Sequence, residues 1–143
     1  ATQSIEDLGS LLPGLLQLKL TGSSLGSVRE LGTGLANLQV LWLGSCGIHD
    51  LSGIGGMAGL RECYLPFNDV VDLYPLSGNE GLEVLDLEGN TIADIDEVAS
   101  LWMCPALTDL TLLGNPLCRE ASYSRSGVCK ALPQLKVLDD VDV

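Results

Sequence analysis

The side chains that could do acid–base or nucleophilic chemistry are few and form no catalytic pattern. His49 is the single histidine, and no serine or cysteine nucleophile has a plausible base partner. We expect the carboxylate pair Asp94 and Asp96 at a helix start, where negative charge complements the helix dipole. No P-loop, zinc-protease or calcium-loop pattern occurs, and the glycines of residues 53–59 do not join a strand to a helix. We therefore predict no enzyme activity and no cofactor or metal.

The cysteines are an odd set of five without C-x-x-C spacing, at positions 46, 63, 104, 118 and 129. Several of them fall where the apolar periodicity calls for a core residue. We therefore predict reduced, buried thiols and a cytoplasmic location. The alternative is a disulfide between Cys118 and Cys129 or a metal site, although no histidine cluster accompanies these residues.

Composition and charge narrow the class of partner. Hydrophobic residues make up 46% of the 143 and charged residues 18%, which excludes an intrinsically disordered chain. Seven Lys and Arg against 19 Asp and Glu give a formal net charge of −12. Because polyanions would be repelled, we expect neither nucleic acid nor a membrane surface as partner. No apolar run approaches the roughly 18 residues that span a bilayer, and we expect a monomer.

One leucine pattern recurs five times along the chain at nearly constant spacing. Its template is L-x-x-L-x-L-x-x-N/C-x-L, and the first leucines lie 23, 22, 22 and 25 residues apart. A single match would be weak evidence, but five in one frame are typical of a leucine-rich repeat solenoid. The matches begin at Leu15, Leu38, Leu60, Leu82 and Leu107.

The spacing within each repeat predicts a short strand followed by a tight turn. Positions four and six are two residues apart, so their side chains point to the same face of a strand. Parallel stacking of the strands then aligns these leucines into one core. Asn68, Asn90 and Asn115 occupy position nine, where an amide can donate to and accept from the turn backbone. The fold class is therefore an α/β leucine-rich-repeat solenoid with a short parallel concave sheet.

The segments that return from one strand to the next carry apolar residues three and four positions apart. This period predicts a convex side made of 3₁₀ turns and helices. The early return segments are rich in glycine and favour 3₁₀ structure. The segment Asp94–Met103 lacks glycine and is the best candidate for an α-helix.

We expect a single domain over residues 1–143. About five repeats fill residues 15–121, preceded by a partial repeat at 1–14. Residues 122–143 depart from the repeat pattern, and because a solenoid must close its open core, we predict a helical C-terminal cap there. The cap should hold an amphipathic helix at about 122–132 and a last strand-like stretch. The apolar residues assigned to the partial repeat are Ile5, Leu8 and Leu11.

Three of the six aromatic residues are predicted on the concave face, which receives positions three, five, seven and eight of each repeat. Trp42 and Tyr64 share position five of adjacent repeats, so their rings should lie roughly 5 Å apart across neighbouring strands. Phe67 is expected near the rim of the same patch. Such a patch is typical of a protein-binding surface, and the alternative is that the rings only cover the sheet.

Acidic residues surround this predicted patch. No Lys or Arg occurs between Arg61 and Arg119, whereas eleven Asp and Glu lie within that stretch. Asp86, Glu88 and Asp109 are predicted on the concave face beside the aromatic residues. The simple explanation is a solvated surface. The functional hypothesis is a protein partner that offers a basic segment with an apolar anchor.

Three further motifs carry a resemblance to one subclass of leucine-rich repeat proteins. They are LDLEGN at 85–90, LLGNPLC at 112–118 and LPQLKVLD at 132–139. Together with the 22-residue step, they resemble the group of the phosphatase-1 regulatory subunit, the axonemal dynein light chain and the spliceosomal A-prime protein. Within this group, residues 15–48 are similar to a flagellar assembly factor of outer dynein arms.

The resemblance implies a non-enzymatic scaffold or adaptor in the assembly or transport of outer dynein arms, in the cytoplasm and the cilium or flagellum. An alternative within the group is a regulatory subunit that docks a phosphatase or another enzyme on its concave face. An RNA-associated module like the spliceosomal protein fits less well, because the predicted concave face is acidic.

Overall fold

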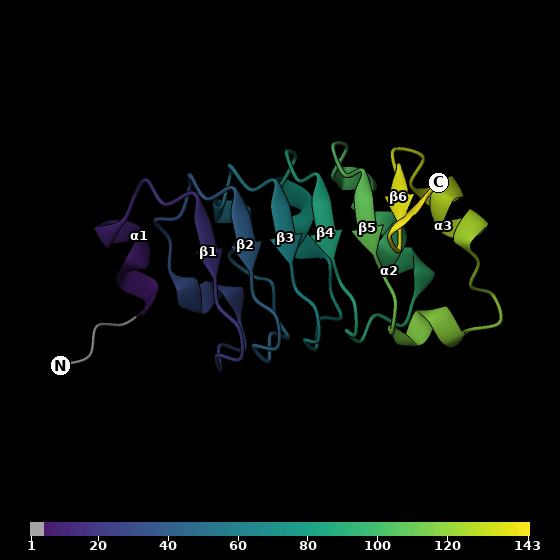
Figure 1. The fold of residues 1–143 in the computed structure, drawn as a ribbon, viewed down its shortest axis with the longest axis horizontal. Helices are drawn as coiled ribbons and strands as arrows, with labels where there is room; N and C mark the ends of the chain where they lie inside the picture. The colour runs from purple at the N-terminus through teal and green to yellow at the C-terminus, as the bar shows by residue number, and fades with distance from the viewer. Residues whose placement is uncertain (1–4) are drawn as a thin grey trace.

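The repeats stack side by side in the computed structural model, which describes residues 5–143 (Figure 1). Within these residues, one sheet contains seven short strands in the order of the chain. The first six strands are parallel, and the seventh pairs antiparallel with the sixth. The predicted parallel solenoid is confirmed. The strands are β1 (Gln17–Lys19), β2 (Val40–Trp42), β3 (Glu62–Tyr64), β4 (Val84–Asp86), β5 (Asp109–Thr111), β6 (Val137–Leu138) and β7 (Val141–Asp142).

The middle residue of each repeat strand points into the core. Leu41, Cys63, Leu85 and Leu110 pair in register across neighbouring strands, and all four are completely buried. The residues that flank them in β2, β3 and β4 are half-buried. Because successive side chains alternate between the two faces of a strand, the sheet keeps one face in the core and the other accessible.

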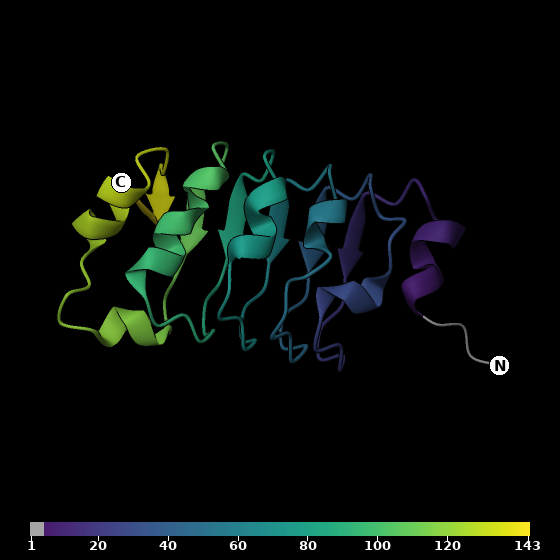
Figure 2. The ribbon, with the colours of Figure 1, turned by 180° about the vertical axis from the view of Figure 1, so that it is seen from behind.

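Helical turns cover the opposite side of the core, as Figure 2 shows. The glycine-rich return segments form 3₁₀ turns, as predicted for the early repeats. Over residues 5–143, three short α-helices lie in the two terminal regions and in the fourth return segment. The 3₁₀ turns are η1 (Ile5–Asp7), η2 (Val28–Leu31), η3 (Ile54–Gly56), η4 (Tyr74–Gly78), η5 (Ser100–Met103) and η6 (Pro116–Arg119), and the α-helices are α1 (Leu8–Leu11), α2 (Ile95–Ala99) and α3 (Arg125–Ala131).

The predicted helix over Asp94–Met103 is an α-helix only in its first half. Asp94 begins it as N-cap, its carboxylate accepting from the backbone N–H of Asp96 at 2.9 Å. The helix then tightens into η5 after Ala99. The carboxylate pair Asp94 and Asp96 therefore lies at a helix start, as expected.

The N-terminal partial repeat is only partly as predicted. Residues 5–11 form η1 followed by α1, and Ile5 and Leu8 are half-buried. Leu11, the third apolar residue assigned to the partial repeat, has 59% of its surface exposed and does not pack into the core. Leu11 is the last residue of α1, where the chain leaves the core before β1. The expectation for residues 1–4 lies outside the described residues.

The C-terminal cap contains the predicted helix, but in a shorter form. α3 begins after Ser124, whose hydroxyl accepts from the Gly127 N–H at 3.0 Å. This N-cap excludes the residues before 124 from the helix. The antiparallel strand β7 was not predicted. Arg125 holds it by donating to the carbonyls of Leu138 and Val141, both at 2.7 Å.

The asparagines at position nine link each turn to its neighbour, as predicted. Asn90 Oδ1 accepts from the Val70 N–H at 3.0 Å, and its Nδ2 donates to the Leu65 carbonyl at 2.8 Å. Asn68 and Asn115 make the equivalent contacts in their repeats. All three amides are buried, so each satisfies backbone groups that water does not reach.

All five cysteines are free, and the alternative disulfide between Cys118 and Cys129 is not formed. Burial raises the pKa of Cys63 to about 12 and that of Cys104 to about 11, so both are inert thiols at neutral pH. Cys118 and Cys129 are half-buried. Between residues 5 and 143, the structure contains no cluster of side chains suited to a metal ion. No helix in this range has the length and apolar character to cross a bilayer.

Candidate functional site

The accessible face of the sheet, here called the open sheet face, is formed by the outer residues of β1 to β5, of which Thr111 on β5 is buried. Its centre is a pair of aromatic rings contributed by neighbouring strands. Trp42 pairs with Tyr64 in the register of β2 and β3. Their ring centroids lie 4.4 Å apart with an interplanar angle of 27°. The predicted neighbourhood of the two rings is confirmed, and both remain half-buried rather than sealed in the core.

Lys19 covers one side of this aromatic pair. It occupies position five of the first repeat and pairs with Trp42 in the register of β1 and β2. Its ammonium nitrogen lies 4.9 Å from the centroid of the Trp42 ring, within the range of a cation–π interaction. Sequence reasoning did not assign Lys19 to the site. Its shared repeat position with Trp42 was the signal that could have found it.

The side chain of Tyr64 is held by a residue of its own strand. Its hydroxyl donates to a carboxylate oxygen of Glu62, two residues earlier on the same face. Burial, the hydrogen bond to Glu62 and the charges of Glu62, Asp109 and Asp86 together raise the pKa of Tyr64 to about 12. The phenol is therefore neutral at physiological pH, and Glu62 is a member of the site that sequence reasoning left out.

The carboxylates of the open sheet face lack cationic partners. Asp86 on β4 is the neighbour of Tyr64 in the register, and Asp109 lies one strand further along, on β5. Asp86 Oδ1 accepts from the Glu88 N–H at 3.0 Å. Burial, followed by the charges of Asp140 and Asp86, raises the pKa of Asp109 above its usual range. Among residues 5–143, Asp86, Glu88 and Asp109 have no ion pair with Lys or Arg. Negative charge therefore accumulates beside the two rings.

Phe67 lies apart from the Trp42–Tyr64 stack. It sits in the turn after β3 with a left-handed backbone (φ 60°) and 60% of its surface exposed. Its ring lies against Gly89 in the next turn, where a methyl group would overlap it. Gly89 itself has φ 68°, a conformation that favours glycine. Phe67 thus extends the accessible apolar surface toward the turn edge, without stacking on the two rings.

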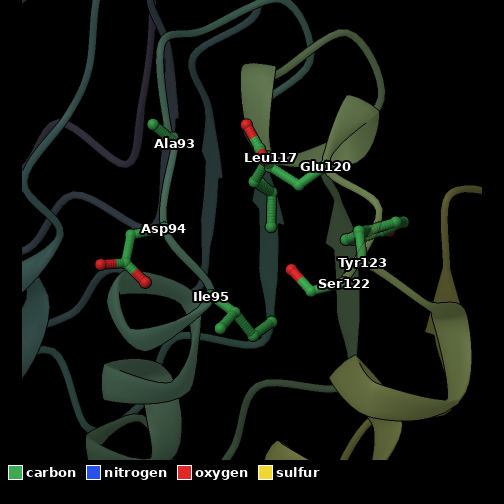
Figure 3. A pocket seen from close by; sticks show the side chains of 7 residues that line it. All are labelled: Ala93, Asp94, Ile95, Leu117, Glu120, Ser122 and Tyr123. Atoms are coloured by element: carbon green, nitrogen blue, oxygen red, sulfur yellow. The ribbon is translucent and has the colours of Figure 1, made fainter.

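A pocket lies at the C-terminal part of the solenoid, away from the open sheet face. Figure 3 shows its lining, which comes from the start of α2, from η6 and from the segment between η6 and α3. Asp94 is already engaged as the N-cap of α2, and Tyr123 shares a hydrogen bond with Cys118 while burial raises its pKa to about 12. The lining residues are Ala93, Asp94, Ile95, Leu117, Glu120, Ser122 and Tyr123. The arrangement has no nucleophile with an adjacent base.

Curated relatives share this repeat architecture over nearly the whole chain. The chain is 48% identical to leucine-rich repeat-containing protein 56 of Homo sapiens over 96% of its length. It is 31% identical to leucine-rich repeat-containing protein 51 of Rattus norvegicus, covering 97% of this chain and 72% of that protein. The chain belongs to the leucine-rich repeat family. Proteins of this family are typically non-enzymatic modules that bind other proteins.

The chain spans about a quarter of the length of the relatives named leucine-rich repeat-containing protein 56. It covers 28% of the human protein and 21% of the homologue from Trypanosoma brucei brucei, to which it is 33% identical over 97% of its own length. No protein-family model matches the chain.

Solved structures agree on the fold. The Drosophila melanogaster SNF/U2A′ complex matches with a TM-score of 0.79 at 22% identity, covering 89% of this chain and 74% of that one. Internalin C2 of Listeria monocytogenes matches with a TM-score of 0.71 at 28% identity, over 93% of this chain and 55% of that one. The two matches support the solenoid architecture assigned above.

Proposed function

We propose that the open sheet face docks a protein partner through a basic segment that carries an apolar anchor. The observation that carries this proposal is the Trp42–Tyr64 stack, which stands half-buried beside carboxylates that have no cationic partner. Trp and Tyr are the residues on which binding energy most often concentrates, and truncating one costs about 2 kcal/mol or more at such positions. The unpaired carboxylates attract a basic segment and fix its orientation. Glu88, and Phe67 at the turn edge, enlarge this surface.

We further propose that the domain is a non-catalytic scaffold or adaptor in the assembly or transport of outer dynein arms, acting in the cytoplasm and the cilium or flagellum. The support for this step is the 48% identity with leucine-rich repeat-containing protein 56, together with the resemblance of residues 15–48 to a flagellar assembly factor. The acidic open sheet face opposes nucleic acid and anionic lipid as direct partners.

The test is capture of outer-dynein-arm subunits from an extract of ciliated cells by the tagged protein. The double variant Trp42→Ala with Tyr64→Ala should lose at least about tenfold in captured subunits, measured by immunoblot. The matched control is Trp102→Ala with Tyr74→Ala, because these rings are 68% and 66% exposed on the helical side. Circular dichroism shows whether each variant keeps its fold.

Salt provides a second readout. Capture by the unmodified protein should weaken between about 50 and 300 mM NaCl, because the screening length for exposed charges falls from about 14 Å to about 6 Å over that range. Undiminished capture by the folded double variant would place the docking surface elsewhere, and capture that is lost equally in the control variant would show that the effect is not specific to the open sheet face.

A further inference from the structure

The residue at position five of the repeat differs in size from one strand of the open sheet face to the next. The register places Lys19, Trp42, Tyr64, Asp86 and Thr111 in one row. Adjacent parallel strands are about 4.8 Å apart, so the nearest neighbour of each side chain across the strands is the adjacent residue of the row. Two large rings are thus followed by two short polar side chains.

The two rings differ in what lies against their outer faces. One face of Trp42 stacks on Tyr64, and the other has the Lys19 ammonium 4.9 Å from the ring centroid. Tyr64 has Trp42 on one face and the short side chain of Asp86 next in the row on the other. Between residues 5 and 143, no cation is recorded against this second face of Tyr64. The outer face of the Trp42 ring therefore has a cation against it, whereas that of the Tyr64 ring has none in the described part of the chain.

The second face of Tyr64, on the side of Asp86, borders negative charge. Asp86 is the next residue in the row, and Asp109 lies on the adjoining strand, paired with Val84 in the register. Asp140 is close enough, with Asp86, to raise the pKa of Asp109. One oxygen of Asp86 accepts the Glu88 N–H, which fixes the carboxylate and leaves its other oxygen without a recorded donor.

We propose that an arginine side chain of the partner binds at this place, between the ring of Tyr64 and the carboxylates of Asp86 and Asp109. Its guanidinium would lie flat on the open face of Tyr64 and donate to the carboxylates of Asp86 and Asp109. An arginine fits better than a lysine, because a planar fork of N–H groups can stack on a ring and pair with carboxylates at once. Lys19 over Trp42 is the same kind of contact made within the chain. The inference rests on the proposed docking role of this face and names the partner group that enters it.

The experiment titrates the ¹⁵N-labelled protein with N-acetyl-arginine methylamide and follows backbone amide shifts by NMR. Shifts should concentrate at Tyr64, Asp86 and Asp109. The lysine analogue should bind at least about fivefold more weakly, and the uncharged citrulline analogue should leave these amides unshifted. Asp86→Asn should lower the affinity for the arginine derivative about tenfold. Tyr64→Leu should remove the preference for arginine over lysine.

The matched control is Asp96→Asn, which removes the same charge from the exposed surface of α2 and should leave the titration unchanged. Three outcomes would each overturn the proposed arginine site: equal binding of the arginine and lysine derivatives, shifts spread over the acidic surface, or no saturable shift. The proposed function is judged separately, by the capture of dynein-arm subunits. Loss of capture in the Trp42 and Tyr64 double variant together with a null titration would retain the docking face and reject the arginine.

Discussion

Replacing Asn90 with alanine tests whether the position-nine amides stabilise the solenoid. The substitution leaves the buried Val70 N–H without its recorded acceptor. An unpaired buried group costs about 1–3 kcal/mol. The Nδ2 bonds to the carbonyls of Leu65 and Leu87 are lost as well.

These two carbonyls are not orphaned, because neighbouring asparagines also donate to them. Asn68 Nδ2 reaches the Leu65 carbonyl at 3.0 Å, and Asn115 Nδ2 reaches that of Leu87 at 2.8 Å. Each lost bond therefore removes only about 0.5–1 kcal/mol. Together with the orphaned N–H, the expected loss for Asn90→Ala is about 3 kcal/mol in the free energy of unfolding.

The same reasoning predicts a larger loss in the free energy of unfolding for a second variant, Asn68→Ala. Asn68 Oδ1 accepts from two buried N–H groups, those of Cys46 and Ile48, at 2.9 and 3.0 Å. Asn68→Ala orphans both, so its loss should exceed that of Asn90→Ala by about 1–3 kcal/mol. The control is Asn37→Ala, since Asn37 is exposed and makes a single side-chain bond to the Pro13 carbonyl. It should change stability by less than about 1 kcal/mol.

Urea unfolding followed by circular dichroism measures all three variants, with the midpoint and slope fitted together. A loss below about 1 kcal/mol for Asn90→Ala, or Asn68→Ala no worse than Asn90→Ala, would refute the assignment of stability to orphaned backbone groups. The open sheet face is not altered by these substitutions. Binding to the arginine derivative should therefore persist at urea concentrations where the variants remain folded.

Two further outcomes follow from local geometry and charge. Gly89→Ala should destabilise by about 1 kcal/mol more than Gly47→Ala in urea unfolding, because both glycines have a left-handed backbone but only position 89 meets the Phe67 ring; the difference should vanish when Phe67 is also alanine. Asp109→Asn should raise the melting temperature at pH 7 and leave it unchanged at pH 3. The pKa of Asp109 is raised from 3.8, so its ionisation destabilises the folded state as pH rises through that region.

Repetition made most of the fold predictable from the sequence. The strands, their register and the buried asparagines follow from a template that recurs in one frame, and the structure has each of them where the template places it. The stacking of Trp42 on Tyr64 followed for the same reason, since two residues at one template position in adjacent repeats become neighbours across strands. Their role in binding remains a prediction.

What the template could not predict lies where the repetition stops. After the last repeat, the Asp139 side chain replaces a main-chain acceptor: its Oδ1 accepts from the N–H groups of Leu112 and Leu113 at 2.7 and 3.1 Å. In the preceding repeat the equivalent N–H group, that of Leu87, donates to the Thr111 carbonyl. Asp139 and Asp140 both have left-handed backbones, which lets the chain reverse into β7. No periodic signal marks this hairpin. It depends on two non-glycine residues in an uncommon conformation, held by contacts distant in sequence.

The partner groups of the open sheet face escaped prediction for a different reason. Lys19 and Glu62 fall at positions five and three of the repeat, on this face, but their contacts with Trp42 and Tyr64 depend on side-chain rotamers. A repeat template fixes the position of each Cβ atom and leaves the direction of a long side chain open. Contacts between neighbouring rings are therefore easier to predict than the cation or carboxylate that completes them.

The carboxylates of the open sheet face connect stability with binding. Core positions must repeat if the strands are to stack, whereas position five holds a different residue in each of the first five strands. Burial and, after it, repulsion by Asp140 and Asp86 make the ionised form of Asp109 unfavourable in the folded chain. A bound guanidinium would reverse that repulsion. Asp109→Asn should therefore stabilise the free domain at neutral pH and weaken its binding of the arginine derivative. If Asp109 had only a structural role, the substitution would not change the two quantities in opposite directions.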